Sequence, residues 1–295
     1  MNATAIVMRK PASAQLLVSS TDRYPDSSTR LEYPTTSADW KLNLRSYPLQ
    51  GYFKRLAITQ IQFQWNIPTI VDGKNDVFVI QIDGNPYVIA LTPGFYSGED
   101  LATEIEDEVI AQGGVDAASF TATFAGGAFT FEIGAGHTFA FTIPPDTTDP
   151  DTIINNRFLI TIGATASSVN PTLSYTTGIA PLIYTRFVDM CSSYLTKWQS
   201  VKDNTTHPNG IVSSVLARIY AVPPNVLVNA AQAGQLFAIP WQMTVDFNVP
   251  KFIEWSPQET IANFDIQLRD EYGDLIYWSQ DFPTEYQFTL FASED

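Results

Sequence analysis

The amino-acid sequence predicts a mainly β protein, a two-sheet sandwich or jelly roll that carries a small inserted α+β domain. Aromatic residues make up 13% of the chain and charged residues only 16%, which favours strands around a sizeable core. Outside residues 97–112, no long run shows the 3.6-residue period of a helix. The flanks hold roughly eight alternating runs without helical crossovers, as expected for two packed antiparallel sheets.

The inserted domain is predicted over residues 75–164 and begins with a β-hairpin. Residues 77–82 alternate in the manner of a strand, and residues 87–91 return as a second strand. Between them, the sequence Asp-Gly-Asn-Pro at residues 83–86 is typical of a tight turn, because Gly accepts a positive φ and Pro fixes a negative one.

A helix is predicted over residues 97–112. Ser97 is a suitable N-cap, and Asp100 completes an acidic capping box. The apolar stripe of this helix recurs every four residues, at Leu101, Ile105 and Val109. Gly113 and Gly114 are expected to end it.

A small meander is predicted after the helix, from alternating runs at residues 120–124, 128–133 and 137–143. An acidic, proline-containing link then leads into an apolar stretch at residues 155–163 that closes the domain. No second helix is expected there.

The flanking segments are predicted to form one discontinuous sandwich from residues 22–74 and 165–295, preceded by a flexible arm at residues 1–21. The strongest flanking strand lies within residues 53–68. Strict alternation along this strand predicts one side with Leu56 and Ile58 beside glutamines, and an opposite, apolar side that is buried against a second sheet. The opposite side comprises Ala57, Thr59, Ile61, Phe63 and Trp65.

The net charge of −15 is unevenly distributed along the chain. Residues 1–55 hold eight Lys and Arg against four Asp and Glu, whereas residues 76–163 hold thirteen acids against Arg157. Nucleic-acid binding depends on phosphate neutralisation by Lys and Arg, so no specific nucleic-acid site is expected. Arg9 and Lys10 in the basic front end are candidate partner contacts; the alternative is an ordinary solvated arm.

Cysteine usage and hydropathy indicate a soluble chain made in a reducing compartment. Cys191 is the single cysteine, so an intrachain disulfide is excluded, and a buried inert thiol is expected. The first residues are too short and too weakly apolar for a signal peptide, and no apolar run has the length of a membrane span.

Signatures of catalysis and metal binding are weak. His137 and His207 stand in unrelated settings, and the sequence has no nucleophile elbow, zinc motif or P-loop. Asp146, Asp149 and Asp151 could supply oxygen ligands to Ca²⁺, but they lack the glycine and terminal glutamate of an EF-hand, which favours a solvated acidic turn. No enzymatic activity, cofactor or metal is therefore expected.

The second half of the predicted helix carries Glu106, Asp107 and Glu108. Negative charge is unfavourable near a helix C-terminus, so this cluster is tolerable only on a surface that faces water. It is a candidate contact for a basic partner.

The run from Phe78 to Val109 resembles a segment of penton and minor capsid proteins of virophage- and polinton-like double-stranded DNA viruses. The positions that carry this resemblance are Gly94, Tyr96, Ser97, Asp100, Leu101 and Ile105. A second run, from Arg186 to Thr206, is similar to a strand and loop of the same family. Its matching positions are Val188, Asp189, Ser192, Leu195 and Thr196. The hairpin at residues 261–278, with its turn at Asp270 and Gly273, is similar to the last hairpin of the family. The stretch at residues 160–163 departs from the Leu-Gly-Phe-like closure of the family.

The resemblance implies a single jelly-roll β-sandwich with an inserted domain, assembled as a homopentamer at the five-fold vertices of an icosahedral capsid. It implies contacts with the surrounding major capsid protein, a location in the virion, and synthesis in the host cytoplasm or nucleus. A host receptor could bind through the inserted domain. The arm with Arg9 and Lys10 would then lie inward or across neighbouring subunits, and the acidic insertion would project outward.

Two alternatives from other functional classes stay open. The first is an attachment or carbohydrate-binding module that uses aromatic platforms such as Tyr96, Trp241 or Trp255. The second is a β-sandwich hydrolase with paired carboxylates, whose spacing in space is invisible in the sequence.

Overall fold

The computed structural model describes residues 13–20, 39–44, 49, 51–113, 119–141, 150–164, 171–199, 215–221, 240–256, 259–276 and 285–294. The chain divides into two compact units. The first comprises Met1–Trp65, Thr185–Val222 and Gln242–Asp295, and the second comprises Asn66–Tyr184 and Pro223–Trp241. The insertion expected at residues 75–164 lies inside the second unit, which begins earlier and ends later.

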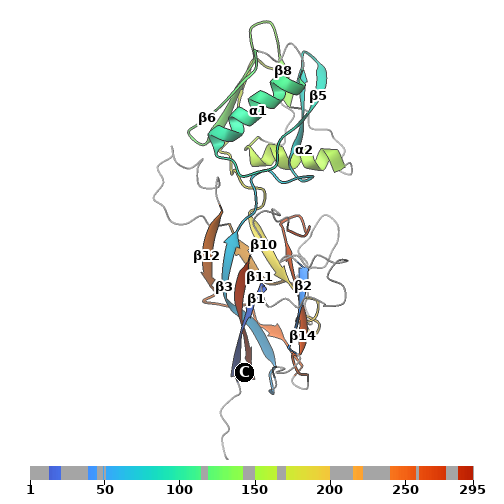
Figure 1. The fold of residues 1–295 in the computed structure, drawn as a ribbon, viewed down its shortest axis with the longest axis vertical. Helices are drawn as coiled ribbons and strands as arrows, with labels where there is room; N and C mark the ends of the chain where they lie inside the picture. Colours follow the sequence, from blue (N-terminus) through green and yellow to red (C-terminus); the bar gives the residue numbers. More distant parts are fainter. Residues whose placement is uncertain are drawn as a thin grey trace, which may run out of the picture. The chain divides into compact units, whose positions relative to one another are not determined.

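The first unit is a sandwich of two antiparallel sheets (Figure 1). The first sheet has the order β1 (Ser13–Ser19), β15 (Tyr286–Ser293), β3 (Arg55–Trp65) and β12 (Trp241–Asp246), and the short β13 (Ile253–Glu254) also pairs with β3. The second sheet has the order β11 (Val215–Tyr220), β10 (Phe187–Cys191), β14 (Asn263–Arg269) and β2 (Asp39–Asn43). Without β13, the first sheet takes strands one, eight, three and six of the unit. This order is that of a jelly roll, and the predicted fold class is confirmed.

The core of the sandwich is filled by large aromatic side chains from both sheets. Trp40 of β2 and Tyr286 of β15 are buried, and the Trp40 Nε1–H donates to the Tyr286 hydroxyl at 2.6 Å. Phe63 lies against Tyr286 with ring centroids 6.0 Å apart. The hydrogen bond satisfies the polar tips of both side chains, so they can join the sheets at little cost.

Strand β3 does not keep the strict alternation that its sequence predicts. Its pairing with β15 passes from Gln60–Thr289 directly to Ile58–Leu290, so Thr59 is skipped. Such a bulge places two residues opposite one and reverses the alternation. Leu56 and Ile58 are therefore buried, as Ile61 is, and the prediction that they share a face with the glutamines is wrong.

The second unit contains two three-stranded sheets and two helices. One sheet has the order β5 (Asn85–Ala90), β4 (Val77–Ile82) and β8 (Phe139–Phe141), and the other has the order β6 (Thr121–Ala125), β7 (Ala128–Glu132) and β9 (Ser174–Thr176). Helix α1 (Gly98–Gln112) contacts β5 and β6, and α2 (Pro150–Thr161) contacts β4. The predicted hairpin and first helix are confirmed. The last run of the predicted meander, β8, pairs with β4 of the hairpin.

Helix α2 corrects the expectation that the apolar stretch at residues 155–163 is not helical. Its C-terminus is a Schellman motif, in which Ala164 N–H donates to Leu159 O at 2.8 Å and Gly163 N–H to Ile160 O at 3.0 Å. Gly163 has a φ of 76°, and a Cβ at this residue would lie 2.7 Å from Ile179 O. Only glycine fits this position, and it ends the helix within the apolar stretch that was expected to close the domain.

Phenylalanines dominate the core of the second unit. Phe78 of β4 stacks on Phe158 of α2 with ring centroids 4.4 Å apart, and Phe131 meets Phe141 edge to face at 5.1 Å. This cluster joins both small sheets to the helices and gives the unit its own core. Within the described part of the chain, neither helix is long and apolar enough to span a membrane.

Candidate interaction surface

Helix α1 begins as its sequence predicts. Ser97 Oγ accepts a hydrogen bond from Asp100 N–H at 3.0 Å and donates to Asp100 Oδ2 at 2.7 Å. Gly113 is its C-cap residue. No basic residue stands in the last turn, so the acidic second half of the helix is not neutralised on the helix itself.

The acidic residues predicted as partner contacts on α1 differ in their availability. Glu106 Oε2 accepts from Ala122 N–H of β6 at 2.9 Å, and Glu108 Oε2 accepts from Gln112 Nε2. Asp107 is exposed. Glu106 therefore binds a backbone group of its own unit. The partner contact predicted for Glu106, Asp107 and Glu108 stays a prediction. Arg9 and Lys10 lie outside the described residues.

Other α1 side chains also cap backbone groups of the adjoining strands. Glu104 Oε1 accepts from Thr92 N–H at 2.9 Å. Gln112 binds both backbone groups of Ala90, with Ala90 N–H donating to Oε1 at 3.0 Å and Nε2 donating to Ala90 O at 2.9 Å. These contacts stabilise the edge of β5, which would otherwise present unpaired backbone groups.

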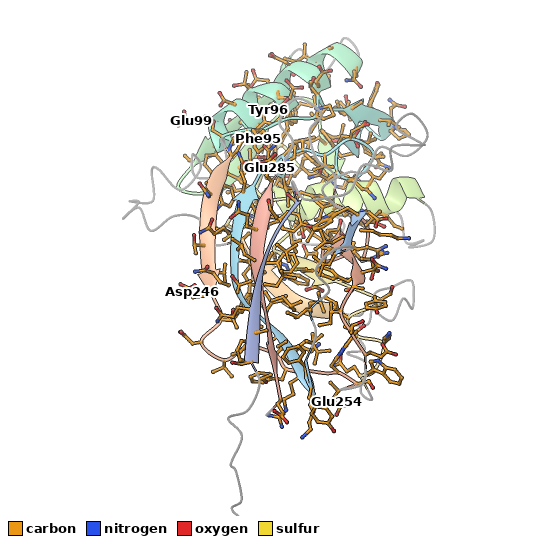
Figure 2. All side chains as sticks on the ribbon, turned by 60° about the horizontal axis from the view of Figure 1, so that its bottom comes forward. Phe95, Tyr96, Glu99, Asp246, Glu254 and Glu285 are labelled. Carbon is orange, nitrogen blue, oxygen red and sulfur yellow. The ribbon has the colours of Figure 1, made fainter. Side chains whose placement is uncertain are left out.

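The aromatic side chains that the carbohydrate-binding alternative requires are not well exposed to solvent. Trp255 and Trp241 are 4% and 9% exposed. Tyr96, labelled in Figure 2, is half-buried, and its hydroxyl donates to Thr92 O at 2.8 Å. Burial, together with the charge of Glu104, raises the pKa of Tyr96 to about 12. Trp241 and Trp255 are thus part of the packing of the fold, and Tyr96 is anchored through its hydroxyl.

Three described carboxylates have a clearly shifted pKa, and each shift is downward. The described carboxylates with a clear pKa shift, Asp83, Glu259 and Asp265, all have a lowered pKa, whereas a catalytic acid needs a raised one. For Asp83 the cause is the hydrogen bond from His137, whose Nδ1 lies 2.6 Å from Asp83 Oδ2. His137 thus ties its own loop to the β4–β5 turn. His207, Asp146, Asp149 and the side chain of Asp151 lie outside the described residues.

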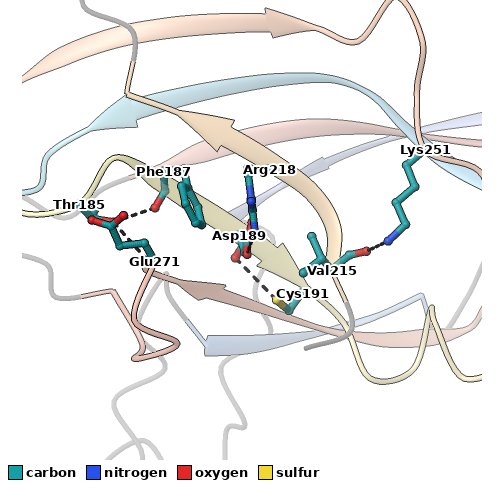
Figure 3. Close-up of polar contacts among 8 residues, drawn as sticks. All are labelled: Thr185, Phe187, Asp189, Cys191, Val215, Arg218, Lys251 and Glu271. Carbon is teal, nitrogen blue, oxygen red and sulfur yellow. Dashed lines mark hydrogen bonds and ion pairs between the residues drawn. The ribbon is translucent and has the colours of Figure 1, made fainter. Parts of the chain in front are cut away.

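The outer face of the second sheet contains a buried ion pair. Asp189 of β10 is fully buried, and its two oxygens accept from Arg218 Nε at 2.7 Å and Nη2 at 2.8 Å (Figure 3). The Arg218 side chain is 30% exposed. The hydrogen bond to Asp189 raises the pKa of Arg218 above its usual range. The Asp189 carboxylate therefore lies beneath the protein surface, and the Arg218 guanidinium is the member of the pair that reaches solvent.

Two aromatic rings hold Arg218 in place. Its guanidinium carbon lies 3.8 Å from the ring centroid of Phe187, and the rings of Phe187 and Tyr220 meet edge to face at 6.0 Å. Tyr220 is 57% exposed. We call the set Phe187, Asp189, Arg218 and Tyr220 the arginine face. Its cation is fixed in one orientation by a fork of two hydrogen bonds and by stacking.

Cys191 lies beside this pair as an inert thiol. It is buried, and its Sγ donates a weak hydrogen bond to Asp189 O at 3.8 Å. Burial and the charge of Asp189 raise the pKa of Cys191 to about 12. A thiol with this pKa is protonated at neutral pH and is a poor nucleophile.

A second ion pair near the start of β10 has the same arrangement. Arg186 Nε donates to Glu271 Oε2 at 2.6 Å, and the side chain of the arginine is 75% exposed while that of the glutamate is 7% exposed. Glu271 belongs to the turn that the sequence predicts at residues 270–274. Asp270 stabilises this turn by accepting from Tyr272 N–H and Asp274 N–H, each at 2.9 Å.

The segment after β10 is fastened to β14 by one carboxylate. Asp265 accepts hydrogen bonds from Ser192 Oγ, from Ser193 N–H and Oγ, and from Tyr194 N–H, at 2.8–3.1 Å. Burial opposes ionisation of Asp265, but these bonds together outweigh it and lower the pKa. Four donors converge on one anion, which orders the segment.

A lysine surrounded by aromatic rings continues this segment. Lys197 Nζ lies 4.1 Å from the ring centroid of Tyr194 and 5.2 Å from that of Trp255, and it forms an ion pair with Glu259. Trp255 Nε1–H donates to Glu259 O at 3.1 Å. The space between these aromatic rings is occupied by Lys197 of the chain itself. The lysine joins two loops and leaves no place for a foreign cation.

The outer face of the first sheet has a different chemistry. We call the following set the glutamine face: Leu17, Gln60, Gln62, Thr244, Asp246, Gln287 and Thr289. Asp246, labelled in Figure 2, is its one ionisable member, and Gln60 Nε2 donates to Asp246 Oδ1 at 2.7 Å. Apart from Leu17, amide and hydroxyl groups make up the rest of the set. Arg55 of β3 and Glu254 of β13, which are exposed and paired in register, lie outside the set.

Comparison with known proteins finds likeness in structure only. No protein-family model and no curated protein matches the sequence. A crystal structure of the mavirus penton protein matches over 95% of this chain and 99% of that chain, with a TM-score of 0.51 and 11% identity. A cryo-EM structure of the Sputnik virophage contains a chain that matches over 97% and 98%, with a TM-score of 0.42 and 10% identity. The chain thus has the fold of the mavirus penton protein, as the resemblance in sequence implied.

Proposed function

We propose that this chain is a structural capsid protein that forms the pentameric vertex of an icosahedral capsid of a double-stranded DNA virus. The observation that carries the proposal is the likeness to a penton protein over 95% of this chain and 99% of that one, which includes the inserted unit. A general sandwich would share its strands with that protein, but not a large insertion between β3 and β10.

The physical features of the chain support this role. A vertex protein acts through assembly, so it needs no active site, cofactor or metal, and we propose that this chain is not an enzyme. A five-membered ring needs two different contact surfaces on each subunit, because its interfaces are heterologous. The arginine face and the glutamine face differ in the required way. The inert Cys191 suits a protein made in the reducing cytoplasm or nucleus of a host.

We further propose that the chain contacts the major capsid protein around the vertex. The arm with Arg9 and Lys10 would face inward, while the acidic inserted unit would face outward, where it could bind a host receptor. In the inserted unit, Asp107 is exposed and available to a basic partner.

The native mass of the purified full chain tests the ring. We expect light scattering and native mass spectrometry to give five times the 32.7 kDa of one chain. A stable dimer or trimer would overturn the proposal. A monomer moves the test to co-expression with the major capsid protein, where absence of the chain from the five-fold vertices of the resulting particles would overturn it.

A further inference from the structure

We propose that neighbouring copies of this chain join through the arginine face of one protomer and the glutamine face of the next, with Arg218 bound to Asp246. This inference rests on the proposed vertex ring and names the surfaces that close it. The occupant of each face is therefore a second copy of this chain.

The arrangement of the sandwich supplies the first argument. The two outer faces belong to the two opposed sheets, so they point away from each other. A contact between two identical faces gives a closed dimer, whereas a contact between unlike faces gives a ring when the rotation from one subunit to the next closes, and every subunit then uses both faces. A ring built on this sandwich is thus most simply closed by unlike faces.

Charge supplies the second argument. Each copy has a net charge of −15, so two copies repel each other unless their contact surfaces present few carboxylates. The arginine face meets this condition because Asp189 is fully buried and Arg218 is the exposed partner. The glutamine face meets it because Asp246 is its single carboxylate. Within the two named sets, Arg218 and Asp246 are the ionisable groups that reach solvent.

Preorganisation supplies the third argument. Arg218 uses Nε and Nη2 to bind Asp189 and stacks on Phe187, so its orientation is fixed before any partner arrives. Fixing a long side chain in advance lowers the entropy cost of association. Arginine and tyrosine are also the residue types that contribute most at protein interfaces, and Tyr220 lies beside Arg218 with over half of its surface exposed.

The glutamines suit the same contact. A side-chain amide can donate and accept, so Gln62 and Gln287, which pair across β3 and β15, can bind polar groups of a neighbour without a buried charge. Gln60 holds one oxygen of Asp246 and thereby orients this carboxylate. Asp246 is thus oriented by a hydrogen bond to a neighbouring side chain, as Arg218 is on the arginine face.

Cross-linking with a bismaleimide tests the assignment of faces. The full chain would carry Tyr220→Cys and Thr244→Cys together, one on each face; Cys191 is buried with a raised pKa and serves as the internal control in the unmodified chain. We expect the double variant to give a ladder of linked chains that ends at five, while each single variant gives none. Dimers from a single variant, or no ladder from the double variant, would overturn the inference. Links from either face to the major capsid protein in co-assembled particles would also overturn it.

Charge reversal tests the Arg218–Asp246 pair. Asp246→Arg sets two cations against each other and should raise the concentration at which the ring dissociates by about tenfold or more. Asp107→Arg makes the same change of charge at an exposed residue of the second unit, outside both faces, and should leave that concentration unchanged. Equal dissociation of both variants would overturn the pair.

These outcomes separate the inference from the proposed function. A pentamer by mass that gives no ladder overturns the assignment of faces and leaves the vertex role in place. A ladder that continues beyond five overturns the closed ring and leaves the assignment of faces in place. Because the reagent also captures brief contacts at high protein concentration, the ladder decides the faces even where the isolated chain has the mass of a monomer.

Discussion

The two outer faces of the sandwich handle polar groups in opposite ways. The glutamine face presents neutral amides and hydroxyls that water can solvate without further help. The arginine face takes Asp189 fully out of water and covers it with a guanidinium and a phenyl ring. The two sheets of one sandwich thus carry outer surfaces that differ in charge and in the cost of burying polar groups. This is possible because side chains alternate along each strand, so the outward-facing residues differ while the inward-facing ones fill the core.

The difference has an energetic side. Burying an ion pair costs desolvation, and the pair repays this cost only through good geometry and complete hydrogen bonding. The Asp189–Arg218 pair has both, with two bonds below 3 Å. The amides of the glutamine face are not buried and carry no comparable desolvation cost, so substitutions there should change the free energy of unfolding far less.

The largest effect is expected from Arg218→Met, which leaves the Asp189 carboxylate buried without its partner. Unfolding in urea, followed by tryptophan fluorescence, should show a loss of about 3–5 kcal/mol. The control is Lys41→Met, which removes an exposed cation from β2 of the same sheet and should cost less than about 0.5 kcal/mol. Similar losses in both variants would mean that Asp189 is not the vulnerable group of this face.

A smaller effect is expected from Asp265→Ala. The change deprives Ser192, Ser193 and Tyr194 of their common acceptor, and should cost about 1.5–3 kcal/mol at neutral pH. The pKa of Asp265 is lowered in the folded chain, so its contribution is complete above the unfolded value near 4. As the pH falls through that value toward the folded pKa, the stability gap between wild type and variant should close. A gap that stays constant from pH 7 to pH 3 would contradict this account.

The smallest effect is expected from Gln62→Glu on the glutamine face. Gln62 is exposed and contributes to no buried network, so the free energy of unfolding should change by less than about 0.5 kcal/mol. A loss as large as that of Asp265→Ala would show that neutrality of this face is a condition of folding, and would erase the contrast between the two faces.

The sequence predicts those parts of the fold whose signals are local. The start of α1 is confirmed at Ser97 and Asp100, because a capping box involves residues three apart. A turn within residues 83–86 is confirmed for the same reason, but it is shorter than predicted, because Asn85 and Pro86 already belong to β5 and pair with β4.

Helix α2 shows where local signals mislead. Its sequence, PDTIINNRFLIT, is rich in β-branched residues with low helix propensity, and it lacks a regular apolar stripe. The available signals were a proline at its first residue and Gly163 just beyond its end, an asymmetry typical of helices. Tertiary packing of Phe158 on Phe78 overrides the propensity. The bulge at Thr59 is likewise set by the partner strand β15, which lies over two hundred residues away.

The arginine face could not be predicted from the sequence. Asp189 and Arg218 come from different strands, and their pairing depends on the register of β10 with β11. The sequence resemblance marked Asp189 as a family position without giving it a role. The acidic cluster at Glu106 was visible, but its bond to Ala122 N–H depends on how β6 packs against α1, which no spacing along the helix reveals.

The position of β15 also sets an order on how the chain is made. β15 is the last of the described strands in sequence, yet it lies between β1 and β3, with Ser13 paired to Ser293. The first sheet therefore stays incomplete until the ribosome has passed residue 293, whereas α1, α2 and the strands β4 to β9 all precede residue 185. During translation the inserted unit can fold first, and closure of the sandwich, with its very distant contacts, is the slow final step.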